Sequence, residues 1–315
     1  MRSEITAASG PRLLCDQAEQ WLPIREVARQ TGVNPVTLRA WERRYGLIVP
    51  QRTAKGHRLY NHEHVQRILN ILIWLNRGVS ASQVKALLQS PPLVFVQSQA
   101  SDWLPLRQKL MHSVGELDEG RLDESVNQAM ALYPPTTLCE HLLIPLMADL
   151  ELRWQGQFGM QMERVFFHSW LRSKLGARIY YNNRQLTGAP LLLINHSDLP
   201  LDPQLWLIAW LVSSSGCPVE VFDWPLPVGE LALAIDRLAA RAVLLSASKA
   251  LDPIQLGRLL KGIDCPKLLC GSAVIIHKAE LRKHLAAIAG LHLREDLLSA
   301  YQCLQQLKLL QTQLI

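Results

Sequence analysis

Residues 21–60 read WLPIREVARQTGVNPVTLRAWERRYGLIVPQRTAKGHRLY, and this stretch decides the fold of the N-terminal part of the chain. Ile24, Val27 and Ala28 recur at helical spacing and Gly32 follows them, so we predict a short helix that ends at this glycine. An Asn-Pro pair then starts a second helix, because Asn is a favoured N-cap and Pro fits the first helical position. Two short helices across a tight glycine turn predict a helix-turn-helix.

The second helix of such a motif enters the major groove of DNA, with its N-terminal half nearest the base edges. Thr37, Arg39 and Arg43 lie on this helix, and the two arginines are four residues apart and share a face. Leu38 and Trp41 lie on another side, where they are expected to hold the helix to its core. The residues expected to form that core are Val27, Ala28, Gly32, Val33, Leu38 and Trp41.

A basic hairpin follows the second helix. Arg52-Thr53 and His57–Tyr60 are predicted to form two short strands around the turn Ala54-Lys55-Gly56. A hairpin in this place is a wing, which can lay its basic side chains along DNA phosphates or in the minor groove. With the helix included, the residues expected to contact DNA are Thr37, Arg39, Arg43, Tyr45, Arg52, Lys55, Arg58 and Tyr60.

The positive charge of the chain is concentrated in this region. The 315 residues contain 33 Lys and Arg and 27 Asp and Glu, a formal net charge of +6. Residues 22–91 hold 11 of the basic and 3 of the acidic residues, or +8, which leaves 22 basic and 24 acidic residues, or −2, elsewhere. A basic module joined to a slightly acidic body favours binding of a polyanion by the module. For each arginine taken singly, a solvated helix face remains the alternative.

The rest of the chain divides into a helical part and an alternating part. Apolar periodicity predicts helices over 103–111, 117–132, 137–155 and 162–181, and hence a helical bundle. Short apolar runs at 190–194, 219–222, 242–246 and 267–271 alternate with helical segments, which predicts a parallel, doubly wound, flavodoxin-like α/β domain. The predicted divisions are a flexible extension (1–20), a winged helix-turn-helix domain (21–91), a helical bundle (97–185), an α/β domain (188–290) and a C-terminal helix (291–315).

Composition and segment length exclude several classes of protein. With 49% hydrophobic and 19% charged residues, the chain is not a disordered polyelectrolyte. No segment has the roughly 18–20 continuous apolar residues of a membrane helix, and residues 1–20 lack the apolar core of a signal peptide. The six cysteines form no CxxC pair, which fits reduced thiols. We therefore expect a cytoplasmic protein with no metal site, in which Cys265 and Cys270 are buried strand cysteines.

This arrangement closely resembles the MerR family of winged-helix transcriptional regulators. The matching residues keep the family's order and spacing, although Ala40-Trp41 replaces the aromatic-Tyr pair that is common before Glu42. The resemblance implies a homodimer that binds a double-stranded promoter operator, distorts an over-long spacer and so activates transcription by RNA polymerase. The residues that carry it are Ile24–Val27, Gly32-Val33, Thr37-Leu38-Arg39, Glu42-Arg43, Gly46-Leu47, Pro50, Arg52, Gly56, Arg58-Leu59-Tyr60 and Gly78-Val79.

Within the family, the stretch from Asn34 to Tyr45 and the Gly56-His57-Arg58 turn are similar to one subgroup. That subgroup contains enterobacterial curli regulators and cobalamin-dependent photoregulators. The resemblance implies a body made of a helical bundle and a cobalamin-binding-like α/β domain. It also implies a role in curli or biofilm control.

The cobalamin signature of this subgroup is incomplete here. The position of the cobalt-binding His falls at Pro200 or Leu201, and neither side chain can bind a metal. The subgroup's Trp, nine residues and Glu-His become Trp154, eight residues and Glu163-Arg164, and its later Gly-Gly becomes Cys270-Gly271. We therefore expect no cofactor. The degenerate cofactor region comprises Trp154, Glu163, Asp198, Pro200, Leu201, Ser246 and Gly271.

Three other functions remain open beside a sequence-specific DNA-binding regulator. The first is a cobalamin-dependent regulator that responds to light or a ligand. The second is an enzyme carried by the α/β domain, for which the sequence offers no P-loop, no dinucleotide fingerprint and no Ser/His/Asp set, so no catalytic residue is expected. The third is a body that mediates protein interaction or nucleotide sensing. Trp206 and Trp210, four residues apart, are expected to pack in a core rather than to hold a ligand.

Overall fold

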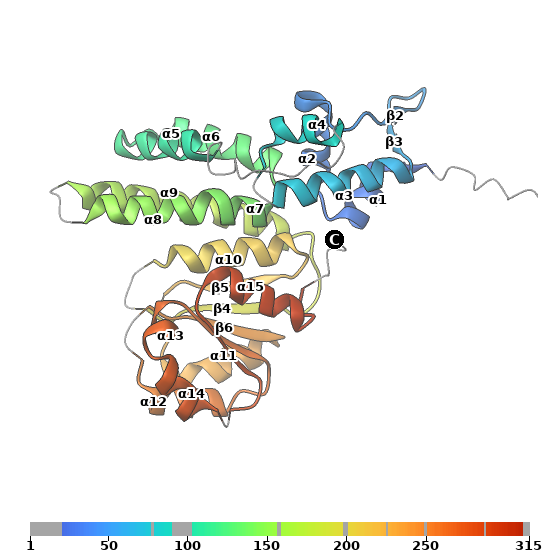
Figure 1. Ribbon diagram of the computed structural model, residues 1–315. Coiled ribbons are helices and arrows are strands. Elements are labelled where there is room, and N and C mark those ends of the chain that lie inside the picture. The colour runs from blue at the N-terminus through green and yellow to red at the C-terminus, as the bar shows by residue number, and fades with distance from the viewer. Residues whose placement is uncertain are drawn as a thin grey trace, which may run out of the picture.

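The computed structural model describes residues 21–76, 79–89, 103–155, 159–197, 201–224, 226–248, 251–286 and 288–310. They form three packed units, which we call the head (21–89), the bundle (103–183) and the sheet domain (191–310). In Figure 1 the bundle lies across the top of the sheet domain, and the head sits at one end of both. Among the described residues, no helix has the length and apolar character needed to cross a membrane.

The head is the predicted winged helix-turn-helix. Gly32 ends the first helix in a left-handed conformation, with φ of 71°, and its N–H bonds to the carbonyl of Ala28. The Asn34 side chain caps the second helix by accepting the N–H of Val36 at 2.8 Å. The elements are β1 (Leu22–Pro23), α1 (Ile24–Thr31), α2 (Pro35–Ala40), the π-helical η1 (Trp41–Tyr45), β2 (Gln51–Arg52), β3 (Arg58–Tyr60), α3 (His62–Asn76) and α4 (Ala81–Gln89).

Two features of the head differ from the sequence prediction. Strand β1 pairs with β3 and makes the wing part of a three-stranded sheet, ordered β1-β3-β2. A two-residue strand that contains Pro23 has no alternating pattern by which it could be recognised. The second helix also continues as a π-helical turn, whose last residue precedes Gly46. Of the expected core residues, Val27, Val33, Leu38 and Trp41 are buried, whereas Ala28 is half-buried and Gly32 is exposed in the turn.

The bundle contains the predicted helices with shifted ends. The expected helix over 137–155 begins at Pro135, because proline fits the first turn of a helix, and it passes through a π-helical segment. The elements are α5 (Trp103–Gly115), α6 (Glu119–Leu132), α7 (Pro135–Leu138), η2 (Cys139–Leu143), α8 (Ile144–Trp154) and α9 (Met160–Asn183).

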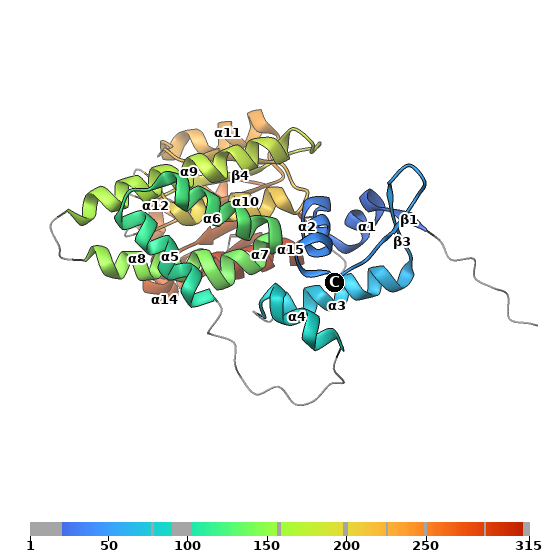
Figure 2. The ribbon, with the colours of Figure 1, turned by 90° about the horizontal axis from the view of Figure 1, so that it is seen from above.

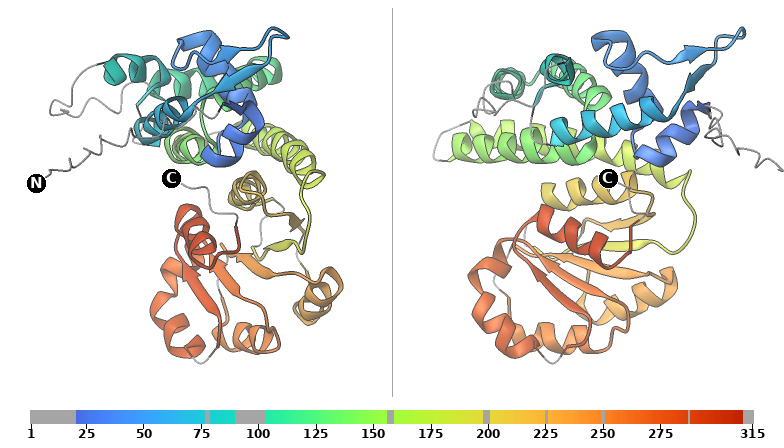
Figure 3. Two further views of the ribbon diagram at one scale, coloured as in Figure 1. Left: turned by 90° about the vertical axis from the view of Figure 1, so that its right-hand side faces the viewer. Right: turned by 45° about the vertical axis from the view of Figure 1, so that its right-hand side comes forward.

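The sheet domain has five parallel strands in the order β5-β4-β6-β7-β8. In chain order this is 2-1-3-4-5, the flavodoxin-like arrangement predicted from the sequence. Helices cover both faces of the sheet (Figure 3). The elements are β4 (Leu191–Asn195), α10 (Pro203–Ser214), β5 (Val219–Phe222), η3 (Val228–Glu230), α11 (Leu231–Leu238), β6 (Ala242–Ser246), α12 (Pro253–Lys261), β7 (Lys267–Cys270), α13 (Ser272–Ile276), α14 (Lys278–Leu285), β8 (Leu291–Arg294) and α15 (Leu297–Gln306).

Strand β8 corrects the expected division at residue 290. Residues 291–315 were expected to form a C-terminal helix, but Leu291–Arg294 pair with β7 and the helix begins only at Leu297. The sequence Leu-His-Leu-Arg lies at the edge of the sheet and is half-buried, so it lacks the continuous apolar run of an inner strand. The fifth strand therefore belongs to the sheet domain.

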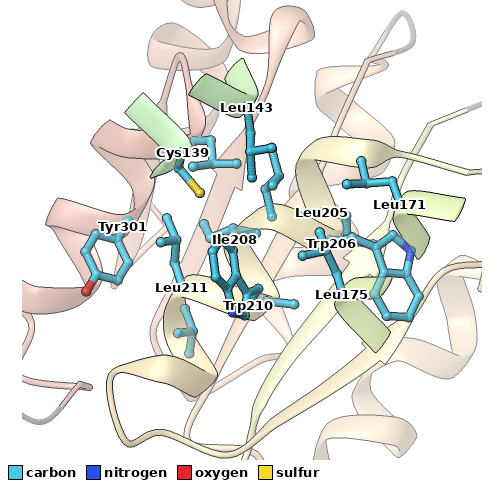
Figure 4. Packing of buried hydrophobic residues seen from close by; sticks show 14 of the residues in the cluster. Cys139, Leu143, Leu171, Leu175, Leu205, Trp206, Ile208, Trp210, Leu211 and Tyr301 are labelled. Carbon is cyan, nitrogen blue, oxygen red and sulfur yellow. The ribbon is translucent and has the colours of Figure 1, made fainter. Parts of the chain in front are cut away.

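Helix α10 joins the sheet domain to the bundle. Its residues from Leu205 to Ser213 are all buried, because the helix packs on the sheet on one side and on α9 on the other. Figure 4 shows Trp206 and Trp210 of this helix among side chains of the bundle, including Cys139 and Leu175. The expectation that both tryptophans serve packing is confirmed by this placement.

The bundle and the sheet domain together form the body. The head contacts the body through the junction between α6 and α7. The Trp41 indole N–H donates to the carbonyl of Leu132 at 2.8 Å, and the Thr137 hydroxyl donates to the side-chain oxygen of Asn76 at 2.9 Å. Tyr133 packs against the core of the head. Figure 2 shows α2 on the side of the head that faces the body, while the wing lies on the outer side.

Candidate nucleic-acid interface and cofactor-like edge

The second helix of the head presents a basic face to solvent. Val36, Arg39 and Arg43 are exposed, and their spacing of three and four residues places them on one side of the continuous α2–η1 helix. Leu38 and Trp41 are fully buried on the opposite side. This is the arrangement in which a recognition helix can read a groove while its apolar side anchors it.

Thr37 is placed differently from Arg39 and Arg43. Its side chain is only 6% exposed, on the part of the helix that faces the bundle. The sequence-based expectation put Thr37 at the DNA surface, since the N-terminal half of a recognition helix lies nearest the bases. In this structure the body covers that position.

The wing is held in place by one carboxylate, Glu42, which is not among the predicted site residues. Glu42 accepts hydrogen bonds from Arg52 at 2.7 Å and from Arg58 at 2.5 Å. Burial opposes the charged form, but the hydrogen bonds from Arg58 and Arg52 hold the pKa of Glu42 below its usual value. The signal was present in the sequence as one acidic residue within a basic stretch. Its meaning depends on the fold, which brings Glu42 and the wing together.

The other wing residues divide into exposed and buried positions. Lys55 is exposed beside Gly56 at the tip of the turn, where φ of 80° suits glycine. Tyr45 is half-buried. Tyr60 is 1% exposed in the core of the head, and its hydroxyl has no hydrogen-bond partner among the described residues. A buried tyrosine of this kind stabilises the head, so its position differs from the surface position expected of a DNA contact.

We call the residues that resemble a cofactor site the cofactor-like edge: Trp154, Glu163, Asp198, Pro200, Leu201, Ser246 and Gly271. At its bundle end, hydrogen bonds join the residues of the edge to one another. The Trp154 indole is 5% exposed, and its N–H donates to Glu163 at 3.2 Å. The second oxygen of Glu163 accepts from Arg153 at 2.7 Å. Both sequence-predicted residues of this end are thus brought together, but they bind each other. The tryptophan face packs on Phe167 and His168 rather than on an open space.

The carboxyl ends of the strands are also occupied by internal contacts. The Ser246 hydroxyl donates to Asp202, whose other oxygen caps α10 by accepting the N–H of Gln204 at 2.9 Å. Burial raises the pKa of Asp202. A Cβ added to Gly271 would lie 2.5 Å from the carbonyl oxygen of Ala247, so the two loops touch there. Asp198 and Pro200 lie outside the described residues.

One of the two positions predicted for a cobalt-binding His lies in apolar surroundings. Leu201 packs against the apolar core and has no donor atom for cobalt. Among the described residues, no group of three His, Cys, Asp or Glu side chains is arranged to hold a metal ion. Trp154 pairs with Glu163, and Ser246 pairs with Asp202.

Comparison with known proteins agrees with this division into head and body. The family model described as the MerR HTH family regulatory protein matches residues 22–91, and the model described as the B12 binding domain matches residues 106–179. The chain is 34% identical over 198 residues to the HTH-type transcriptional regulator MlrA of Salmonella typhimurium, an alignment that covers 63% of this chain and 78% of MlrA.

Two relatives from Myxococcus xanthus are more distant. The HTH-type transcriptional repressor CarA is 25% identical over 273 residues, which cover 86% of this chain and 91% of CarA. The HTH-type transcriptional repressor CarH is 28% identical over 153 residues, which cover 44% of this chain and 50% of CarH. The winged head, the matching family model and the similarity to MlrA lead to one conclusion: the chain belongs to the MerR family of helix-turn-helix transcriptional regulators and is a DNA-binding regulator of transcription.

Proposed function

We propose that this regulator acts in the cytoplasm as a homodimer on a two-fold promoter operator, where it distorts the spacer DNA and activates transcription by RNA polymerase. The observation that carries the proposal is the exposed face of Arg39 and Arg43 beside a wing whose arginines are fixed by Glu42. Distortion of this kind costs a few kcal/mol, which the contacts of two heads can supply. Control of curli or biofilm genes is the corresponding role, because the relative MlrA belongs to this branch of the family.

The arginine face can be tested by substitution. Arg39→Ala is expected to weaken operator binding by about 1–3 kcal/mol, or roughly fivefold to 150-fold, because it removes a contact to a base or to the groove edge. Electrophoretic shift at one fixed salt concentration measures the effect. Arg258→Ala is the matched control, since it removes the same charge from an exposed position on α12. Equal affinities for wild type, Arg39→Ala and Arg43→Ala would exclude the α2–η1 helix as the reading element.

We further propose that the regulator works without cobalamin. The support is the internal pairing of Trp154 with Glu163 and of Asp202 with Ser246. A cobalamin-dependent regulator is the second candidate, favoured by the match to the B12 binding domain. Titration of the full chain with adenosylcobalamin in the dark separates the two. We expect no spectral change and no change in operator affinity, and a saturable shift in the corrin absorption would establish the second candidate.

A further inference from the structure

A cavity of about 550 Å³ lies where the head, the bundle and the sheet domain meet. Its walls come from the turn and the start of α2, from α6 and α9, and from the C-terminal end of α10. Asp202 caps the other end of this helix, and a helix of 12 residues is about 18 Å long. The cavity is therefore separate from the cofactor-like edge. Its volume falls within the range of small-molecule sites, which often lie between domains.

The lining of the cavity mixes polar and apolar side chains and carries a single positive charge among the described residues. Arg178 is the one charged residue among the described residues that line it, and no carboxylate lines it. The guanidinium donates to the side-chain oxygen of Asn127 at 3.2 Å. Asn182 donates to the hydroxyl of Ser213 at 3.1 Å. Arg178 is exposed and has no carboxylate partner among the described residues, so its guanidinium is the group that can bind an oxyanion, in a bidentate manner.

The same cavity is walled by the part of the head that must reach DNA. Asn34, Val36 and Thr37, at the start of α2, line it. Thr37 is 6% exposed, and the Trp41 indole is bonded to the carbonyl of Leu132. Val36 and Arg39 are exposed, but Thr37 can meet base edges only if the head moves away from the body. That movement removes one wall of the cavity.

We propose that this cavity binds a small molecule bearing a carboxylate or a phosphate, and that its occupancy holds the head on the body and lowers the affinity for the operator. The proposal rests on the proposed function, because the regulated activity is operator binding. A ligand that contacts both walls binds the docked arrangement more tightly than the released one, so it shifts the population toward the docked arrangement. By linkage, operator DNA weakens ligand binding by the same factor.

The test uses inorganic phosphate and acetate as minimal probes, each titrated against potassium chloride at constant ionic strength. For one of the two probes we expect operator affinity to fall by about fivefold or more at saturation beyond the effect of chloride. The same probe is expected to raise the unfolding temperature of the full chain in the absence of DNA, because it binds the folded protein. Arg178→Gln is expected to abolish both effects while leaving operator affinity in chloride unchanged.

Arg164→Gln is the matched control, since Arg164 lies on the same helix α9 outside the cavity. It should respond to the probe as wild type does. Equal responses of wild type and Arg178→Gln, or no response of wild type to either probe, would overturn the proposal. If wild type fails to bind the operator in potassium chloride without any probe, the proposed function is wrong. The unfolding temperature would then still show whether the probe binds in the cavity.

Discussion

At the scale of single residues, the head depends on a few side chains that combine charge with burial. Glu42 is the clearest case, because one carboxylate binds two wing arginines and its side chain is 15% exposed. Arg58 is 13% exposed, so it is less free to meet a phosphate than a basic residue in a hairpin suggests. Arg39 and Arg43 remain in solvent. The wing is thus held in place without DNA, and the helix supplies solvent-exposed charges.

Replacing Glu42 with Gln tests this ordering. The lowered pKa means that folded Glu42 stays charged at a pH where the unfolded chain is already protonated. Its contribution to the free energy of unfolding is therefore present above the ordinary carboxyl pKa of about 4.3 and is lost as the pH falls through the lower folded value. We expect Glu42→Gln to destabilise the head by about 1–3 kcal/mol at neutral pH.

Urea denaturation of wild type and variant at neutral and acidic pH measures the difference. Glu63→Gln is the control, because Glu63 is an exposed carboxylate in the first turn of α3. A Glu42→Gln variant as stable as wild type at neutral pH would show that the carboxylate does not order the wing. A difference that stays constant down to pH 3 would contradict the electrostatic cause.

At the scale of elements, the sequence predicts the helices and strands that have a local pattern of apolar residues. It does not predict strands that form only through pairing with a neighbouring strand. Helices α1, α2 and α3 follow from apolar spacing and from caps such as Asn34, and strands β4 to β7 follow from short apolar runs. Strands β1 and β8 were missed, since neither has a pattern of its own and each exists because a neighbouring strand offers hydrogen bonds.

Prediction of the site residues is limited in the same way, because contacts between distant elements are not visible in the sequence. The basic face of Arg39 and Arg43 follows from helical spacing, so the sequence predicts it. The role of Glu42 and the burial of Thr37 and Tyr60 depend on contacts between elements far apart in the chain. Trp154 and Glu163 were identified through a resemblance, but only the structure shows that they bind each other.

At the scale of the whole molecule, the head differs from the rest of the chain in net charge and is held on the body by hydrogen bonds. The head carries a net +8 and the remainder −2, so attraction to DNA is concentrated in the head. The head is nevertheless held on the body by Trp41 and Asn76, which lie far from Leu132 and Thr137 in the chain. The body therefore covers Thr37 at the start of α2, while Val36 is exposed and the wing lies on the outer side.

The most direct test of the DNA-binding assignment is selection of bound fragments from a random DNA library by the full chain, followed by sequencing. Two recognition helices related by a two-fold axis read half-sites about one helical turn, or a multiple of it, apart. We therefore predict enrichment of one palindromic sequence with that spacing by wild type and its loss with Arg39→Ala. Enrichment without a common sequence, or an identical motif from Arg39→Ala, would contradict the account.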